Sequence, residues 1–143
     1  MDRFETFTVL ISKISRSIRK LKSNEMAKYN LKTPHVSCLY YLKKNGNLTA
    51  KNLCDICEED KAAISRSIEY LEKNDFIKCE SKTEKRYKSP LFLTEKGKQV
   101  GDLLVEKIDG ILKISSNGLS TEDRDIFYKC LIKISKNLED ACK

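Results

Sequence analysis

The sequence is short of the features on which membrane spanning, secretion and most enzymatic chemistry depend. No apolar run approaches the roughly 18 residues of a membrane-spanning helix, and two acids but no apolar block lie in the first five residues, unlike a secretory signal. The single histidine, His35, is accompanied by neither a glycine-rich phosphate loop nor a Ser/His/Asp set. These absences predict a cytoplasmic chain with no catalytic residue, no cofactor and no membrane partner. We expect His35 at a surface or an interface.

Metal-binding patterns are also missing, although the chain has six cysteines. Cys54 and Cys57 form a lone CxxC, without a second CxxC or a nearby histidine to complete a tetrahedral zinc site. The six cysteines are scattered through apolar-patterned segments rather than gathered in a loop-rich framework, so we expect thiols. Buried structural cysteines are the favoured interpretation of the CxxC. A thiol that senses oxidants, there or at Cys38 or Cys130, stays open.

What the sequence has in excess is charge. Of its 143 residues, 34% are charged and 40% are apolar, and the net charge is +7 with a pI near 9.1. This length and composition are typical of one small helical domain with much solvated surface. The positive charge indicates an anionic partner, which on this ground alone is a nucleic acid, a membrane surface or an acidic protein.

The N-terminal segment predicts a long amphipathic helix. Its apolar residues recur at alternating spacings of three and four, and basic residues lie between them. Such a narrow stripe can pack on the core or pair with a second chain, and we expect it to do both. The stripe consists of Phe4, Phe7, Ile11, Ile14, Ile18 and Leu21.

Three shorter helices are expected next, joined by connections of only a few residues. Thr33 supplies a capping hydroxyl to the first, which ends at Gly46. Thr49 caps a short second helix that carries Ile56 on its inner side. Asp60 caps the third, which reaches about residue 74.

The helix over 60–74 has two faces of different character. Ile64, Ile68 and Leu71 form a core stripe at helical spacing. Its opposite face is small and polar near the N-terminus and includes an arginine, which suits close approach to base edges in a DNA major groove. That face consists of Ala62, Ser65, Arg66, Glu69 and Lys73. A merely solvated surface is the alternative.

Residues 76–80 and 90–93 predict two short strands that pair as a hairpin. The loop between them is polar and carries Lys82, Lys85, Arg86 and Lys88. An arginine at a loop tip can enter the narrow, electronegative minor groove of DNA, and Glu84 is placed to hold Arg86 by an ion pair. A charged loop is usually only a soluble one, but its place directly after the helix over 60–74 favours a DNA-binding wing.

Two helices complete the chain. The first begins at Glu95 and is broken near Asn117-Gly118. The second begins with a capping box at Ser120. Its apolar stripe consists of Phe127, Leu131, Ile134 and Leu138.

Two motifs carry a resemblance to a known family. The stretch ISRSIEYLEKNDFI, residues 64–77, followed by LTEKGK, residues 93–98, is similar to MarR-type transcriptional regulators, and the flanking helices fall where that family places them. The resemblance implies a mainly α fold with a small two- or three-stranded β wing. Residues 33–94 would form the winged helix-turn-helix of a single domain over 1–143, and residues 1–32 and 95–143 its dimerisation helices.

The resemblance also implies partners. A homodimer would bind a pseudo-palindromic operator in double-stranded DNA as a sequence-specific repressor, and a small, often aromatic, effector would release it. The major groove would be faced by Lys61, Ala62, Ser65 and Arg66, and the wing would contribute Lys85, Arg86 and Lys88. The dimer interface would consist of Phe4, Phe7, Ile11, Ile14, Phe127, Leu131 and Ile134. Where the family's wing often has Asp-x-Arg, this chain has Glu84-Lys85-Arg86.

Two alternatives stay open. One is a regulator controlled by cysteine oxidation. The other is a winged-helix module that binds an acidic protein through its basic wing. Tyr40 and Tyr41 are expected in the core, with a ligand pocket as the alternative for them.

Overall fold

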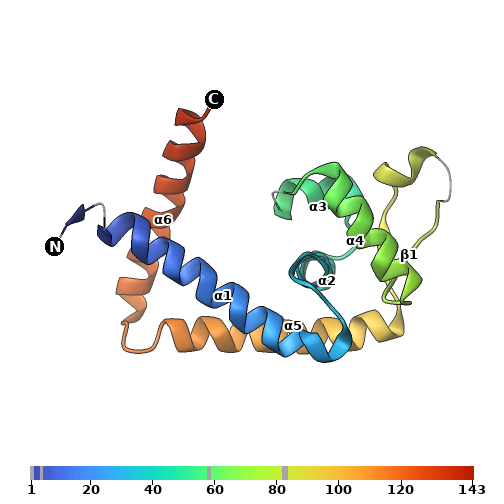
Figure 1. Cartoon of the computed structure of the whole chain (residues 1–143), viewed down its shortest axis with the longest axis horizontal. Coiled ribbons are helices and arrows are strands. Elements are labelled where there is room, and N and C mark those ends of the chain that lie inside the picture. Colours follow the sequence, from blue (N-terminus) through green and yellow to red (C-terminus); the bar gives the residue numbers. More distant parts are fainter. Residues whose placement is uncertain (1, 4, 58, 82–83) are drawn as a thin grey trace. The chain divides into compact units, whose positions relative to one another are not determined.

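The computed structural model is mostly helical and has one two-stranded antiparallel sheet (Figure 1). It describes residues 2–3, 5–57, 59–81 and 84–143, and the side chains at 25, 84 and 85 lie outside that description. The chain divides into two compact units, Met1–Ile111 and Leu112–Lys143. Within the described ranges, no helix has the length and apolar character needed to cross a bilayer. The expected fold class, mainly α with a small β wing, is confirmed.

The first unit contains the helix-turn-helix and its wing. Its elements are η1 (Glu5–Val9), α1 (Leu10–Met26), η2 (Ala27–Tyr29), α2 (Thr33–Asn45), α3 (Ala50–Cys57), α4 (Lys61–Lys73), β1 (Ile77–Cys79), η3 (Glu84–Lys88), β2 (Leu91–Leu93) and most of α5 (Glu95–Ser115). β1 pairs with β2 so that Ile77 lies opposite Leu93. An isolated bridge from Thr49 to Pro90 extends the hairpin towards the start of α3.

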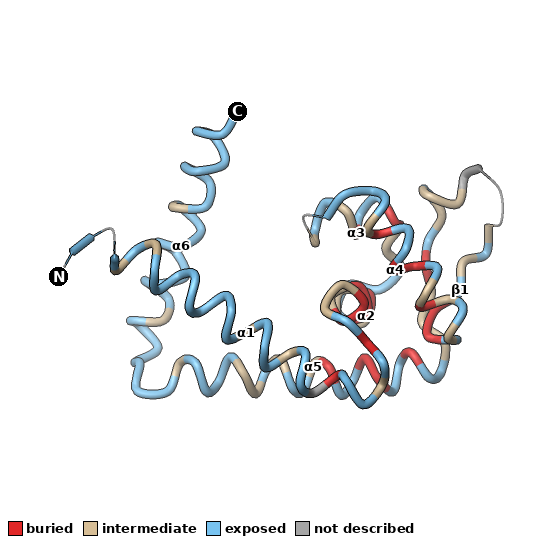
Figure 2. Tube along the Cα trace, viewed as in Figure 1, coloured by how far each residue is buried: buried red, intermediate tan, exposed pale blue. Residues whose placement is uncertain are grey.

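The core of this unit lies between α2, α3, α4, the hairpin and the first half of α5 (Figure 2). Ile64, Ile68 and Leu71 of α4 are buried, as their spacing predicts. Asp60 caps α4 by accepting a hydrogen bond from the Ala63 N–H at 2.7 Å, and Thr49 caps α3 by accepting one from the Asn52 N–H at 3.1 Å. Both predicted caps are therefore confirmed.

Hydrogen bonds from Thr94 and Lys96 hold the start of α5 against the end of α4. The Thr94 hydroxyl donates to the Asp75 carbonyl at 2.6 Å and accepts from the Gly97 N–H at 3.0 Å. A Cβ at Gly97 would lie only 1.9 Å from the Phe76 carbonyl oxygen, so this position admits no larger residue. The Lys96 ammonium donates to the Asn74 carbonyl at 2.9 Å. The LTEKGK motif thus fixes where the recognition helix candidate ends relative to α5.

The second unit consists of the end of α5 and helix α6 (Thr121–Ala141). Gly118 has a φ of 84° between the two helices, a left-handed conformation that favours glycine. The Ser120 hydroxyl accepts a hydrogen bond from the Asp123 N–H at 3.0 Å, so the predicted cap is confirmed. None of the residues of α6 is buried within this chain.

Three sequence-based expectations were wrong. Thr33 is the first residue of α2 rather than its cap, and the cap position belongs to Lys32, whose backbone N–H donates to Nδ1 of His35 at 3.0 Å. His35 is buried rather than exposed, because its ring stacks on Tyr70 with 4.2 Å between centroids. Ile56 is exposed, since α3 is only two turns long and buries Ala50 and Leu53 but no residue of its last turn.

The buried imidazole makes stability depend on pH. Burial, with a smaller contribution from Lys32, lowers the pKa of His35 below its ordinary value of 6.5, so the unfolded chain takes up the proton more readily than the folded one. The stabilisation by neutral His35 should be complete above about pH 6.5 and be lost as the pH falls below it. Urea unfolding between about pH 7.5 and 5.5 measures this loss.

A glutamine is the matched control, because its side-chain oxygen can accept the same Lys32 N–H without titrating. The free energy of unfolding of His35→Gln should fall less over this pH range than that of the wild type. Equal falls would show that other groups cause the pH dependence.

Candidate nucleic-acid interface

The outward face of α4 is free of core residues. Lys61, Ala62, Ser65 and Arg66 are all exposed there, whereas Ile64 is buried on the side that faces the core. The first two turns therefore present small side chains and two cations on a helix that is held rigidly from behind. This geometry suits insertion into a groove of about 12 Å width, as the sequence predicts.

The wing is more structured than the sequence indicated. The expected loop includes a short 3-10 helix, η3, which carries Arg86, Tyr87 and Lys88. Lys88 is exposed, whereas the Lys85 side chain falls outside the described part of the chain. The wing residues are therefore presented from a helical turn and not from an irregular tip.

Arg86 is bound to the recognition helix candidate. Its guanidinium forms a hydrogen-bonded ion pair with Glu72 of α4, and each side chain of the pair is about one third exposed. The bond to Glu72 raises the pKa of Arg86 above its ordinary value. The sequence suggested Glu84 as the partner, but the partner found lies fourteen residues earlier. Arg86 thus ties the wing to α4.

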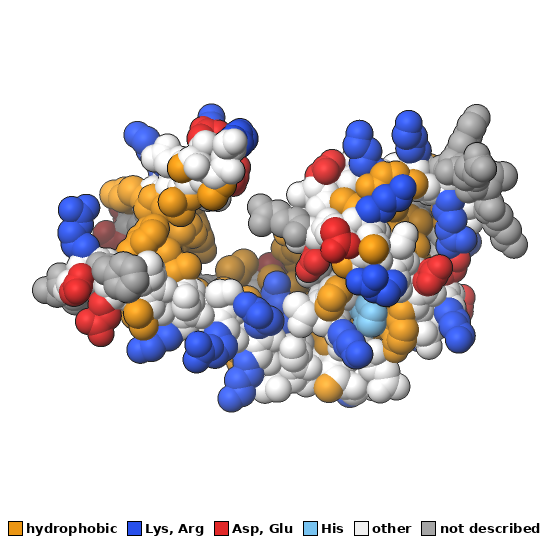
Figure 3. Space-filling model, turned by 45° about the horizontal axis from the view of Figure 1, so that its top comes forward, with side chains coloured by type: hydrophobic (Ala, Val, Ile, Leu, Met, Phe, Trp, Pro, Cys, Tyr) orange, Lys and Arg blue, Asp and Glu red, His pale blue; other side chains and the backbone are white. Residues whose placement is uncertain are grey.

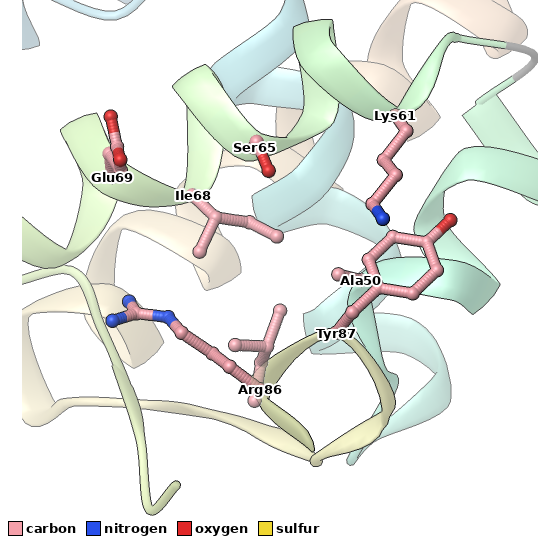
Figure 4. A pocket seen from close by; sticks show the side chains of 8 residues that line it. Ala50, Lys61, Ser65, Ile68, Glu69, Arg86 and Tyr87 are labelled. Carbon is pink, nitrogen blue, oxygen red and sulfur yellow. The ribbon is translucent and has the colours of Figure 1, made fainter. Parts of the chain in front are cut away.

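A surface hollow of about 270 Å³ lies between α4 and the wing (Figure 4). Ser65 and Ile68 point into it from α4, and Arg86 and Tyr87 line it from η3. Its other lining residues are Ala50, Lys61, Glu69 and Leu91. The hollow combines an apolar floor with two cations, the carboxylate of Glu69 and the Ser65 hydroxyl.

Tyr87 is a residue of this surface that the sequence analysis missed. The Lys61 ammonium lies 4.6 Å from the centroid of its ring, a cation–π contact, and its hydroxyl donates to the Cys54 Sγ at 3.3 Å. This hydrogen bond raises the pKa of Tyr87. Tyr87 therefore joins η3 to both α3 and α4. Its position beside Arg86 was the available signal, but neither partner is a neighbour in sequence.

The cysteines are free thiols, as expected. Cys54 and Cys57 are half-buried rather than buried, while Cys38 is fully buried. The Cys38 thiol donates a hydrogen bond to Cys57, which lowers the pKa of Cys57 against the opposing effect of partial burial. Hydrogen bonding and burial raise the pKa of Cys38. Among the residues described, no group of His, Cys, Asp and Glu side chains forms a candidate metal site.

The two apolar stripes that the resemblance assigns to a dimer interface are largely uncovered. In the first unit, Phe7, Ile11 and Ile14 are 39–52% exposed, and Phe4 lies outside the described residues. In the second unit, Phe127 is 48% and Leu131 38% exposed, and Ile134 is half-buried. Apolar side chains gather along α6 in Figure 3. Within a single chain these stripes have no function in the core.

A smaller apolar hollow lies between α1, α2 and α5. Leu21, Met26 and Val36 line it from one side and Leu104, Ile108 and Ile111 from the other, with Lys22 and Lys107 beside them. Tyr40 and Tyr41 do not line this hollow, and their rings contact each other edge to face at 5.3 Å.

The known proteins that resemble this chain in sequence or in structure are transcriptional regulators. No protein-family model matches the chain. An uncharacterized HTH-type transcriptional regulator, YfiV of Bacillus subtilis (strain 168), is 31% identical over 138 residues, which cover 94% of this chain and 84% of the relative. A putative MarR family transcriptional regulator from Listeria monocytogenes, complexed with a 26mer DNA, is 26% identical with a TM-score of 0.80, over 92% of this chain and 87% of that one.

A structure of lower identity shows the same fold. The S. aureus MepR–DNA complex superimposes with a TM-score of 0.82 at 17% identity, over 96% of this chain and 99% of that one. The fold is therefore shared across nearly the whole length of both chains.

Proposed function

The chain belongs to the MarR family of winged helix-turn-helix transcriptional regulators, and we propose that it is a homodimeric repressor. The dimer would bind operators in double-stranded DNA, and a small effector would release it from them. Its relatives are transcriptional regulators and not enzymes. The observation that carries the proposal is the exposed polar face of α4, with Arg66 on it and a basic wing beside it.

In this proposal the recognition helix is α4. Lys61, Ala62, Ser65 and Arg66 face the major groove, and Arg66 hydrogen-bonds a guanine edge or a phosphate. Arg86 and Lys88 of η3 approach the adjacent minor groove together with Lys85, whose side chain lies outside the described residues. Residues 33–94 are the DNA-binding region of a single domain over 1–143, and residues 1–32 and 95–143 dimerise. Two half-sites would lie about one helical turn apart.

The first test is binding to a labelled duplex from the region upstream of the gene, titrated across a salt series. Affinity should fall steeply between 50 and 200 mM salt, by about 10³-fold if at least six phosphates are contacted. Arg66→Ala should weaken binding by roughly 5- to 160-fold, which corresponds to about 1–3 kcal/mol, if Arg66 reads a base. Arg66→Ala should weaken binding to a scrambled duplex of the same length by a smaller factor.

Two variants control for the wing. Arg86→Ala removes the wing arginine, and Glu72→Gln releases it from its partner without removing it. Binding should weaken in the first variant and strengthen in the second, because Glu72 competes with DNA for Arg86. A folded dimer that binds no duplex even at low salt would contradict the proposal and favour a protein-binding module with an acidic partner.

Dimerisation explains the two uncovered apolar stripes. A second copy of the chain would cover Phe7, Ile11 and Ile14 of the first unit and Phe127, Leu131 and Ile134 of the second. Residue 4 belongs to the first stripe by sequence. Burial of these side chains removes apolar surface from water, which supplies the free energy of association.

A buried aspartate in either stripe should break the dimer. Phe127→Asp and Ile14→Asp should each weaken dimerisation on the order of 100-fold, since an unpaired charge would be desolvated in the interface. Ile132→Asp is the matched control, because Ile132 lies on another side of α6 than Phe127 and Leu131. Sedimentation equilibrium measures all three. A monomeric wild type, or equal weakening by Ile132→Asp, would reject this assignment.

The effector would bind in the apolar hollow between α1, α2 and α5. Its volume is only about 10 Å³, room for about one water molecule, so an aromatic ring would enter only after its six apolar lining side chains move apart. Occupation of the hollow would favour a dimer in which the spacing of the two recognition helices no longer fits the operator.

Control by oxidation is a second candidate, favoured by the contact of Cys38 with Cys57. The Cys57 thiolate would attack hydrogen peroxide to give a sulfenic acid and hydroxide, and the Cys38 thiol would then displace water to give a disulfide. Peroxide should abolish duplex binding by the wild type, and dithiothreitol should restore it. Cys57→Ser should resist peroxide, whereas Cys142→Ser, which alters an exposed thiol, should not. Loss of binding in both variants would exclude this thiol pair.

A further inference from the structure

The hollow between α4 and the wing has no function of its own in the assignments above, although Lys61, Ser65 and Arg86 border it. It lies between two elements that, under the proposed function, enter different grooves of the same duplex. In B-DNA the major groove and the adjacent minor groove are separated by one sugar–phosphate strand. A duplex that takes α4 into one groove and η3 into the next therefore lays this strand across the hollow.

The chemistry of the hollow fits such a strand. Ala50, Ile68 and Leu91 give it an apolar floor, which suits the carbon face of a deoxyribose. Lys61 and Ser65 at the rim offer an ammonium and a hydroxyl, both of which contact phosphates in protein–DNA interfaces, and Glu69 adds a carboxylate to the lining. A free small anion would not need the apolar floor.

Lys61 is held at this rim by Tyr87. The ring beneath its ammonium is itself fixed by the hydrogen bond from its hydroxyl to Cys54. A lysine side chain loses rotamer freedom when it is ordered, so an ammonium that is already ordered over a fixed ring loses less on binding. In Figure 4 the Lys61 ammonium points towards the Tyr87 ring, at the side of the hollow and not outward along α4.

We propose that this hollow seats one deoxyribose and its phosphodiester from the strand that separates the two grooves, with Lys61 as the phosphate contact and Tyr87 as the residue that positions it. The proposal rests on the DNA-binding function above. It assigns Lys61 to the backbone rather than to base edges, and it gives Tyr87 a function in DNA affinity.

The test compares Lys61→Gln with the wild type on two duplexes, the upstream duplex and its scrambled version, across a salt series. Loss of one phosphate contact should make the slope of log affinity against log salt shallower by about 0.9, which is about 3.5-fold for a fourfold change of salt. The fold-loss should be equal on both duplexes, because a phosphate contact carries no sequence information.

Tyr87 is tested through its coupling to Lys61. Tyr87→Leu should weaken binding in the wild type but add little in the Lys61→Gln background, while Tyr87→Phe, which keeps the ring, should retain most of the affinity. Lys73→Gln is the matched control, an exposed lysine in the last turn of the same helix. In that background Tyr87→Leu should have its full effect. Circular dichroism and melting curves establish that each variant is folded.

Four results would overturn the proposal. One is a loss in Lys61→Gln that is confined to the upstream duplex with an unchanged slope, which would make Lys61 a base contact. Another is a full effect of Tyr87→Leu in the Lys61→Gln background. The third is competition by inorganic phosphate that disappears in Lys61→Gln, which would make the hollow a site for a free anion. If the wild type binds neither duplex, the proposed function itself has failed; if it binds and Lys61→Gln is unchanged, only the seat is rejected.

Discussion

The structure of the first unit depends on one close approach of two backbones. The first turn of α5 rests on the carbonyl of Phe76, at a point where no Cβ fits, so Gly97 sets the distance between α5 and the end of α4. Thr94 bonds both sides of the same point, to Asp75 and to Gly97. The hairpin begins directly after Phe76 and ends directly before Thr94. The angle of the wing relative to α4 is therefore set at these two ends of the hairpin.

Side-chain contacts then join the wing to the helices at three further places. Arg86 reaches back to Glu72 near the end of α4, and Tyr87 contacts Lys61 near its beginning and Cys54 on α3. These contacts span the full length of the helix on one side of it. The wing and α4 are in this way a single surface, whose charges are partly engaged with one another before any ligand arrives. A polyanion that binds there would compete with Glu72 for Arg86, whereas Lys61 would meet it already placed over the Tyr87 ring.

Features with a local cause could be predicted from the sequence. The caps at Thr49, Asp60 and Ser120 follow from side chains three residues away from the N–H groups they satisfy, and the stripe of α4 follows from its period. Among the errors, those at His35 and Arg86 depend on distant partners, whereas Thr33 was misplaced by one residue at a helix end. His35 is buried because Tyr70 lies thirty-five residues later in the chain but stacks on its ring. The partner of Arg86 and both partners of Tyr87 were missed for the same reason, since no short-range pattern marks a contact between different elements.

The separation of the two faces of α4 has a consequence for how such a protein can diverge. Ile64, Ile68 and Leu71 hold the helix in place, and none of the residues on its outer face contributes to the core. After gene duplication, the outer positions can therefore drift without loss of folding stability, because the substitutions that alter recognition and those that would unfold the domain fall on different residues. One scaffold can in this way give rise to paralogues with different targets. Tyr87 does not share this freedom to be substituted, because it contacts both α3 and α4.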